Sequence, residues 1–567
     1  YDITPIRATY TTGTSPSTNN CFATTDESTT VVVNLTGHNG LDGDFVTFSG
    51  AVDVGGIPAA DLNKEFQITF INANSFSITV TTAATSTVAA GGGTSIVAAF
   101  QWNTGFSTAT LGYGWGTGAW SRSTWGSGST IPIYLNPRLI YQDKFNNDLI
   151  FNVSGADIYY WVYNNAFSNR AVKLSSIAGA IAVPKQVTFT LFAPSGHLFA
   201  MGCTNYDAAA SAPDYEGVYD PLLVRWANVN ANVGPEPEVW QPTATNSAGF
   251  LRIKSGSEIV AAANTRQETL VWTDYSLSSL QFLGTAEVFS LQELSNSISI
   301  MGPKVVAEAN NVVYWMGNDK FYAYSGRVDT LPSTLKRYIF DDINREQSQI
   351  FFAGTNREFN EVIWFYVSDT SNEIDRYVIY NYQEQIWYYG TLERTAWIDA
   401  TVADNATGLY NGWVYSHEKG NDDGQPLGAP PLPINAYIQS ADVDITDGNQ
   451  FILTKRIIPD VDFTDSDINN SVTGAVLDPQ VTMTVGVRNF PGAAAAYTDV
   501  GAGSLARDVA TATDPATSTA IIDQYTNQVF VRARGRQMSF KIESDGIGVQ
   551  WQLGSPRIDL RPSGRRG

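Results

Sequence analysis

The chain has 567 residues, of which 43% are hydrophobic and 12% aromatic, so it is large enough and apolar enough to form several folded cores. Only 16% of the residues are charged and the formal net charge is -21, which argues against a general nucleic-acid-binding protein, because such proteins neutralise phosphates with lysine and arginine. No run of 18 apolar residues occurs and the first residues lack the apolar stretch of a signal peptide, so we expect a soluble protein made without export.

Three segments are expected before residue 131. Residues 1–23 are polar and turn-rich, and we expect an N-terminal extended segment that lies over another subunit or domain. Residues 24–100 hold short β-forming runs between turns rich in Gly, Pro, Asn and Asp, which predicts a small inserted β domain, a candidate fibre dock or decoration. Residues 101–130 alternate glycine with aromatic residues but lack the Gly-Lys-Ser/Thr of a phosphate loop, so we predict a Gly/Trp-rich loop that docks on a neighbouring surface. The docking rings would be Trp115, Trp120 and Trp125.

The middle of the chain repeats one pattern. Residues 360–390 are typical of a strand, a turn, a second strand and the start of a third, with aromatic residues throughout. Similar stretches begin at residues 147, 197, 266, 310, 360 and 407. Such a period is typical of β-propeller blades, because one small twisted sheet cannot bury both faces alone and stacks its aromatic side chains on the next. We predict an all-β fold with a six-bladed β-propeller over residues 131–430; a long irregular β-sandwich with accidental spacing is the alternative.

Long polar insertions interrupt this region at residues 204–221, 228–249 and 416–433. Loops of this length usually carry function or make interfaces. Helical periodicity is scarce, and residues 334–344 are the best helix candidate.

Residues 431–567 return to strand patterns and predict a C-terminal β-sandwich-like platform domain with a flexible insertion at residues 490–520. Val529, Val531 and Ala533 alternate with arginines, which predicts a half-exposed strand with a row of arginines on its open face. Residues 532–567 contain eight basic and three acidic residues, a net charge of +5 on a chain that is acidic as a whole. We predict docking to an acidic partner surface, a second copy of the chain included, with a solvated strand face and a direct DNA contact as the alternatives. The docking candidates are Arg532, Arg534, Arg536, Arg557 and Arg561.

Catalytic and metal-binding patterns are not found. The three histidines, His38, His197 and His417, fall in different parts of the chain, and neither a GxSxG elbow nor an HExxH motif occurs. The aspartates near residues 442–447 and 460–467 do not have the spacing of a calcium-binding EF-hand loop. Cys21 and Cys203 are too few for a disulfide framework, so we predict two isolated buried thiols. We therefore expect no enzyme activity, no cofactor and no bound metal.

Several stretches resemble one family. The ending VRARGRQMSFKIESDGIGVQWQLGSPRIDLRPSGRR, the opening YDITPIRATYTTG and the loop GYGWGTGAW are similar to tail nozzle or hub proteins of short-tailed bacteriophages, also called tail tubular protein B or DNA-stabilisation proteins. Residues 31–99 resemble a small β module that recurs in phage tail proteins. These stretches cover about a third of the chain and are descriptive rather than catalytic.

The resemblance implies a virion protein of the tail, assembled in the host cytoplasm as a homohexameric ring beneath the head-to-tail connector and its adaptor ring. Such a ring first closes the DNA exit channel and later lets the DNA pass through it, without sequence-specific DNA binding. It also implies tail fibres or spikes docked outside, and a host envelope met only during ejection. The alternative function is a glycan-binding or glycan-degrading β-propeller of a tailspike-like protein.

Overall fold

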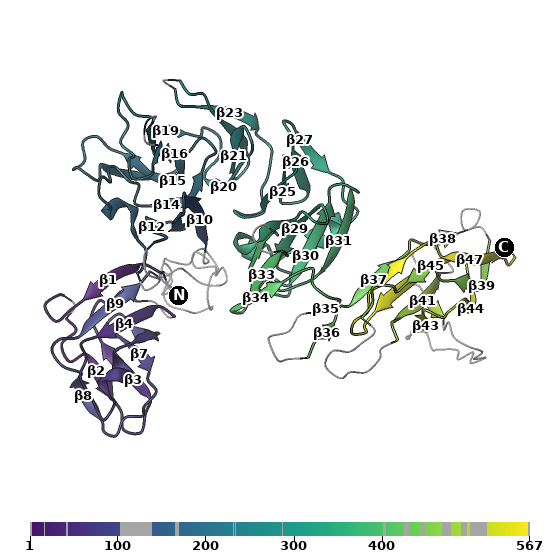
Figure 1. The fold of residues 1–567 in the computed structure, drawn as a ribbon, viewed down its shortest axis with the longest axis horizontal. Coiled ribbons are helices and arrows are strands. Elements are labelled where there is room, and N and C mark those ends of the chain that lie inside the picture. The colour runs from purple at the N-terminus through teal and green to yellow at the C-terminus, as the bar shows by residue number, and fades with distance from the viewer. Residues whose placement is uncertain are drawn as a thin grey trace, which may run out of the picture. The chain divides into compact units, whose positions relative to one another are not determined.

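The structure, a computed structural model, describes the chain apart from residues 1–2, 16, 41–42, 103–138, 165–168, 231, 233, 286, 401–403, 424–429, 445–449, 468–477, 489–495, 499–518 and 565–567. The fold is all-β and consists of many small antiparallel sheets, as the sequence predicts. The chain divides into two compact units, Tyr1–Ala400 and Thr401–Gly567 (Figure 1). No helix in the described part of the chain has the length and apolar character needed to span a membrane.

The first unit begins with an N-terminal module, residues 3–102, built from two sheets around one core. One sheet has the order β1 (Ile6–Tyr10), β9 (Val97–Gln101), β4 (Phe45–Ser49) and β5 (Glu65–Gln67). The other has the order β6 (Thr69–Asn72), β7 (Ser75–Thr79), β3 (Thr30–Asn34), β2 (Phe22–Thr24) and β8 (Val88–Gly91). A short helix, α1 (Ala59–Leu62), precedes β5. Buried residues of both sheets, Phe48 and Phe76 among them, belong to one hydrophobic cluster, so the two sheets fold as one body.

The start of the chain differs from the extended segment expected over residues 1–23. Strand β1 pairs antiparallel with β9, and the Tyr10 ring lies edge-on against Phe100 with centroids 5.6 Å apart. Strand β2 likewise pairs with β3 and β8. The difference arises because the β-forming residues Thr9 and Tyr10 find a partner strand some 90 residues later, which local sequence does not reveal.

Five further four-stranded sheets follow in the described part of the first unit, and in each the strands are antiparallel neighbours. The first two are β10 (Ile140–Phe145), β11 (Asp148–Val153), β12 (Ile158–Trp161), β13 (Val172–Lys173); and β14 (Val187–Phe192), β15 (Leu198–Tyr206), β16 (Glu216–Trp226), β19 (Gly249–Arg252). The third and fourth are β20 (Ile259–Asn264), β21 (Glu268–Thr273), β22 (Leu277–Phe282), β23 (Phe289–Ser295); and β24 (Val306–Ala309), β25 (Val312–Met316), β26 (Phe321–Tyr324), β27 (Val328–Leu331). The fifth is β28 (Phe352–Asn356), β29 (Glu361–Tyr366), β30 (Arg376–Asn381), β31 (Ile386–Thr391), after which comes β32 (Ala396–Ile398).

The first strands of these sheets lie next to one another. β10 contacts β14, β20 contacts β24, β24 contacts β28, and β28 contacts β32. The Lys304 ammonium, just before β24, donates a hydrogen bond to the Ile140 carbonyl at the start of β10, 2.7 Å away. The fourth sheet therefore touches the first although 164 residues separate the two groups. Figure 1 shows the sheets succeeding one another in an arc within this unit.

Aromatic side chains fill the space between neighbouring sheets. Trp272 of the third sheet and Trp315 of the fourth have ring centroids 5.3 Å apart, and Phe321 of the fourth lies 4.9 Å from Trp364 of the fifth. The Trp364 indole nitrogen also donates to the Val305 carbonyl at 3.0 Å. This is the stacking between sheets that the repeated aromatic-rich strand segments predict.

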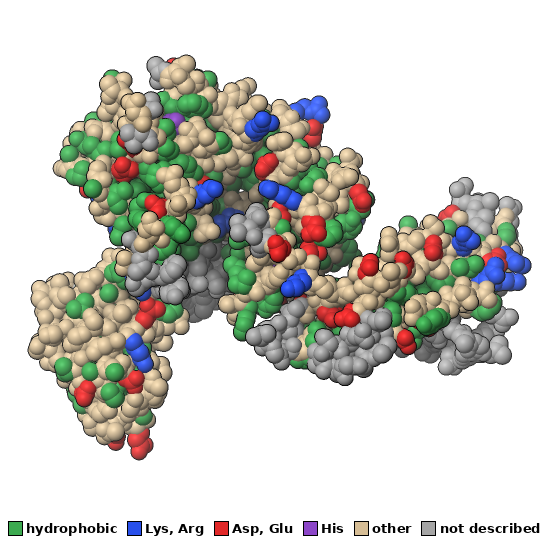
Figure 2. Space-filling view, viewed as in Figure 1, with side chains coloured by type: hydrophobic (Ala, Val, Ile, Leu, Met, Phe, Trp, Pro, Cys, Tyr) green, Lys and Arg blue, Asp and Glu red, His purple; other side chains and the backbone are tan. Residues whose placement is uncertain are grey.

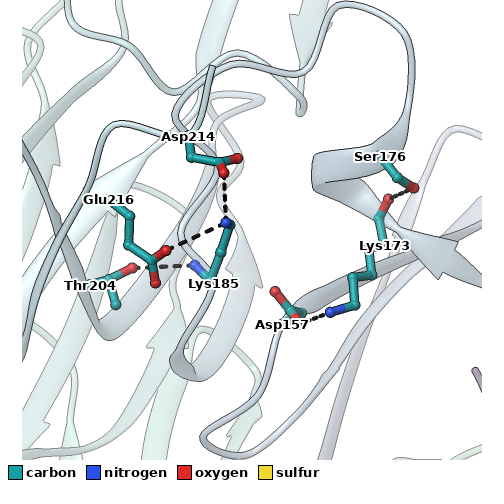
Figure 3. Close-up of polar contacts among 7 residues, drawn as sticks. All are labelled: Asp157, Lys173, Ser176, Lys185, Thr204, Asp214 and Glu216. Atoms are coloured by element: carbon teal, nitrogen blue, oxygen red, sulfur yellow. Dashed lines mark hydrogen bonds and ion pairs between the residues drawn. The ribbon is translucent and has the colours of Figure 1, made fainter. Parts of the chain in front are cut away.

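Two of the long insertions are structured. In the first, β15 runs to Tyr206 and β16 begins at Glu216, so the connection is shorter than the predicted loop. Lys185 pairs with Asp214 at 2.8 Å and with Glu216 at 3.4 Å and holds the connection against β14 (Figure 3). The second insertion contains the hairpin β17 (Asn228–Asn230) and β18 (Gly234–Glu236) and the fully buried Trp240.

Helical structure is short, as expected. The sequence candidate at residues 334–344 contains α2 (Lys336–Phe340), whose Ile339 is buried. Two 3-10 turns, η1 (Leu174–Ser176) and η2 (Arg345–Ile350), are the other helical segments among the described residues besides α1.

The second unit contains two hairpins and two larger sheets. The hairpins are β33 (Thr407–Tyr410) with β34 (Trp413–Ser416), and β35 (Asp422–Asp423) with β36 (Leu432–Pro433). The larger sheet holds β37 (Ala436–Gln439), β38 (Val443–Asp444), β41 (Gln480–Arg488), β42 (Ala496–Thr498), β43 (Thr519–Asp523) and β45 (Gln537–Ser544). The smaller sheet has the order β44 (Val529–Gly535), β39 (Ile452–Ile458) and β47 (Arg557–Pro562), and a further pair joins β40 (Val461–Asp462) to β46 (Gln552–Leu553).

The two larger sheets share one core. Val485 and Ile542 from the six-stranded sheet and Val531 from the three-stranded sheet belong to the same buried cluster. The insertion expected at residues 490–520 lies mostly outside the described residues, but β42 within it and β43, which begins at its end, both pair with β41. The core shared by Val485, Ile542 and Val531 covers one face of the three-stranded sheet.

Candidate docking face on the carboxyl-terminal sheet

The three-stranded sheet brings together strands that are far apart in the sequence. β39 lies in the middle and pairs antiparallel with β44 on one side and with β47 on the other. About 70 residues separate β39 from β44, and about 100 separate it from β47. The sheet therefore places side by side basic residues that are far apart in the sequence.

The alternation predicted for β44 is present. Val529, Val531 and Ala533 are buried in the core, whereas Phe530 and Arg534 are exposed. On the middle strand β39, Ile457 is buried, and Lys455 and Arg456 are both exposed beside a register shift. On β47, Arg557 and Arg561 are exposed. All the outward side chains therefore occupy one open face.

The register places these side chains in rows. Leu453 in the middle strand is opposite Arg534 on one side and Arg561 on the other. Arg456 is opposite Phe530 and Asp559 in the same manner, and Arg557 is opposite Ile458. We call the outward residues Arg456, Phe530, Arg534, Arg557, Asp559 and Arg561 the arginine face.

Several of these guanidinium groups are held in place by neighbours. Arg534 donates from Nη2 to the Ser563 carbonyl at 2.9 Å and from Nε to the Ser563 hydroxyl at 3.1 Å, and it lies 4.5 Å from the centre of the Phe451 ring. Arg561 pairs with Asp559 at 3.3 Å. A guanidinium that is already ordered loses less entropy when it binds a carboxylate, so these contacts favour recognition by the face.

The face is electropositive on an acidic chain. Its described members contain four arginines and a single aspartate, so its formal charge is +3. Figure 2 shows lysine and arginine side chains gathered at the end of the second unit that carries β39, β44 and β47. Phe530 adds an aromatic ring that is 65% exposed. Arginine and exposed aromatic rings are the residue types most enriched in protein–protein contacts.

The predicted docking residues separate into three groups. Arg534, Arg557 and Arg561 lie on the face. Arg536 lies beyond the end of β44, half-buried and 5.4 Å from the centre of the Phe451 ring, because the chain bends at Gly535 to begin β45. The side chain of Arg532 and the loop rings Trp115, Trp120 and Trp125 lie outside the described residues.

Sequence reasoning missed Arg456 and Phe530. The stretch QFILTKRII is rich in β-forming residues, which is a strand signal. Strict alternation from buried Ile452 and Thr454 would turn Arg456 inward, and a register shift between Thr454 and Arg456 turns it outward, which the sequence does not announce. The sequence also does not show that β39 is the centre of the sheet, since strand order depends on long-range pairing.

Two of the three histidines, His38 and His197, are buried in hydrophobic surroundings. His197 is 1% exposed, with its ring nitrogens 3.0 Å from the Ser195 hydroxyl and 3.2 Å from the Ser247 hydroxyl, and burial lowers the pKa of His197 to about 4. His38 is fully buried; its Nε2 is 2.9 Å from the Asn72 carbonyl, and burial lowers its pKa too. Both rings contact phenylalanines, so their role is to fill cores with satisfied hydrogen bonds.

The thiols and acidic groups have equally plain surroundings. Cys21 and Cys203 are free and buried, which confirms the prediction of two isolated thiols, and burial raises the pKa of each to about 12. Among the described residues no group of three or more His, Cys, Asp or Glu side chains is placed to hold a metal ion.

No protein-family model and no curated protein matches the chain. Among solved structures, Hsv2 from Kluyvelomyces marxianus is similar over 50% of this chain and 73% of its own, with 8% identity and a TM-score of 0.26. The computationally designed Ika8 protein is similar over 70% of this chain and 96% of its own, with 12% identity and a TM-score of 0.28. The phage phi92 endosialidase is similar over 61% of this chain and 45% of its own, with 13% identity and a TM-score of 0.15. At such values these similarities assign no function to the chain.

Proposed function

We propose that this protein is a structural subunit of a ring that surrounds a passage, as in the tail nozzle or hub proteins of short-tailed bacteriophages that its sequence resembles. In this proposal residues 131–430 form a six-bladed β-propeller in the ring wall, and residues 431–567 form a β-sandwich platform. The ring first closes the DNA exit channel and later lets the DNA pass, and it catalyses no reaction.

One observation carries the proposal. The first strands of successive four-stranded sheets are neighbours, and the Lys304 ammonium reaches back to the Ile140 carbonyl of the first sheet at 2.7 Å. A contact between sheets that are not consecutive is expected when the sheets surround a common axis, and it is not expected when they form an open row. This supports a propeller over an irregular sandwich.

The charge balance supports a conduit. A net charge of -21 repels the phosphates of passing DNA, so DNA slides through an acidic lumen instead of adhering to it. The partners in this proposal are further copies of the chain in a homohexamer, the adaptor or connector ring, and tail fibres or spikes. The place of action is the virion tail, after assembly in the host cytoplasm.

The test is the assembly state of the purified protein. Mass photometry and negative-stain imaging, with and without the adaptor protein, are expected to show a ring of six copies. A strictly monomeric protein at high concentration under both conditions would overturn the proposal. Depolymerisation of a host polysaccharide by the pure protein would instead favour a glycan-active propeller.

A further inference from the structure

We infer that the arginine face is a subunit contact that binds the acidic end of the N-terminal module of a second copy of this chain. The inference rests on the proposed ring, because it names the two surfaces that join neighbouring copies.

The acidic counterpart is found in the N-terminal module. Residues 1–102 contain eight acidic and two basic side chains, a net charge of -6. Both bases have acidic partners, since Arg7 lies 3.6 Å from Asp44 and Lys64 lies 3.4 Å from Asp61. Among the described residues of the module, Asp26, Glu27 and Asp53 are the acids that have no basic partner.

Three exposed acids lie at one end of the module, whereas exposed Glu65 lies on β5 and pairs with Arg170 at 2.9 Å. Asp26 and Glu27 are exposed in the turn between β2 and β3, and Asp53 is exposed near the turn at Gly55. Residues 84–87 join the two turns, because the Glu27 amide donates to the Ala84 carbonyl at 2.8 Å and the Thr85 amide donates to the Gly55 carbonyl at 2.7 Å. Figure 2 shows acidic side chains at the end of this module away from β1.

The arginine face is better suited to carboxylates of a protein than to phosphates of a nucleic acid. Asp559 lies within the face and Phe530 leaves a large apolar ring exposed, and neither favours a phosphate backbone. The rest of the chain is also strongly acidic and repels a polyanion at long range. An acidic protein surface gains from both the guanidinium groups and the ring.

A second copy is the partner that the charges favour. The same chain carries a +3 face on its C-terminal sheet and an acidic end on its N-terminal module, so each copy offers one surface of each sign. Two different patches that pair head to tail form a heterologous contact, which closes into a ring when the rotation allows.

Charge reversal tests this pairing. Arg456→Glu/Arg561→Glu makes the face acidic, and Asp26→Lys/Glu27→Lys makes the module end basic; each variant alone is expected to raise the dissociation concentration of the assembly by about 100-fold or more. The two variants mixed in equal amounts are expected to assemble again, because each acidic surface then meets a basic one. Recovery on mixing also shows that the contact joins different molecules.

A control for the arginine-face variant has the same change in net charge. Arg252→Glu/Arg327→Glu reverses two exposed arginines at the second and fourth sheets, which pair with Asp220 and Asp329. This control is expected to assemble as the wild type does. Thermal unfolding of every variant separates folding from assembly. If a reversed variant does not fold, wild-type assembly in about 50 mM and about 500 mM salt replaces it, and assembly is expected to weaken as salt screens the contact.

The outcomes distinguish the inference from the proposed function. Wild-type rings together with unaffected reversal variants, or no recovery on mixing, would overturn this contact and leave the ring proposal standing. A wild-type protein that never assembles would overturn the ring itself. Loss of binding to a short DNA duplex in the arginine variant, with assembly unchanged, would mean that the face binds nucleic acid and would also overturn the inference.

Discussion

Strands β29 and β44 show two ways in which this chain uses a sheet. In β29 the residues from Val362 to Tyr366 are all buried, because the fourth sheet packs on Trp364 from one side and Trp397 of β32 packs on Phe365 from the other. In β44 buried Val531 and Ala533 alternate with exposed Phe530 and Arg534, because a core covers one face alone. A strand covered on both sides stabilises the fold, whereas a strand covered on one side leaves a regular row of side chains for a partner.

The largest effect is expected at the strand that is covered on both faces. Trp364 is fully buried and contacts Phe321 and Trp387. Trp364→Ala removes this packing and the hydrogen bond to Val305, and is expected to lower the free energy of unfolding by about 3–5 kcal/mol. Urea denaturation followed by circular dichroism measures the change. A loss below about 1 kcal/mol would contradict the two-sided packing of the fifth sheet.

The next effect concerns a buried charge. Arg225 on β16 is 2% exposed and donates to the carbonyls of Thr204 at 3.0 Å, Ala182 at 2.7 Å and Trp240 at 3.4 Å. Arg225→Met leaves these acceptors without a donor and is expected to cost about 2 kcal/mol or more. Limited proteolysis is expected to cut the β15–β16 connection faster in this variant.

The exposed Arg252→Met is the control for that experiment. Arg252 pairs with Asp220 at 2.6 Å on the surface, and its loss is expected to cost less than about 1 kcal/mol. Equal effects for the two substitutions would mean that the Arg225 hydrogen bonds contribute no more than a surface ion pair.

A pH-dependent effect is expected at the contact between the second and third sheets, where His197 packs on Phe289. Burial lowers the pKa of His197 to about 4 from an ordinary 6.5, so the unfolded chain binds the proton more readily. The neutral His197 ring therefore contributes fully to the free energy of unfolding above pH 6.5. This contribution, about 3 kcal/mol at most, is lost as the pH falls toward 4. Unfolding free energies of the wild type and His197→Gln, measured from pH 7 to pH 4, are expected to converge. Parallel curves would contradict a buried neutral imidazole.

The smallest effect on folding is expected on the open face. Phe530→Ser removes an exposed ring and is expected to change the free energy of unfolding by less than about 0.5 kcal/mol. The same variant is expected to assemble more weakly, because the ring is available to a partner. A lowered melting temperature beside unchanged assembly would mean that Phe530 belongs to the fold and not to a contact.

Sequence periodicity predicted the elements formed by local pattern. The all-β fold, the aromatic stacking between small sheets, the short helix near residue 336 and the alternation around Val531 all follow from spacing along the chain. Pairing between distant segments was not predictable in this way. The association of β1 with β9, and the position of Arg456 between β44 and β47, depend on which edges meet in the folded chain.

The candidate site was predictable in charge but not in shape. The excess of arginines after residue 532 is visible in the sequence, and three of the five predicted arginines lie on the face. Arg536 differs because Gly535 ends the strand and turns the chain, and a single glycine does not announce such a bend. Neither the ring nor the role of the face follows from one chain alone, since both depend on contacts between copies.

A low-resolution electron microscopy map of the purified assembly tests the central claim most directly. We predict a closed ring of six subunits around an open passage, with the small sheets of each subunit arranged radially about a local axis in its middle region. A compact particle without a passage, or subunits whose sheets form an open row, would contradict it.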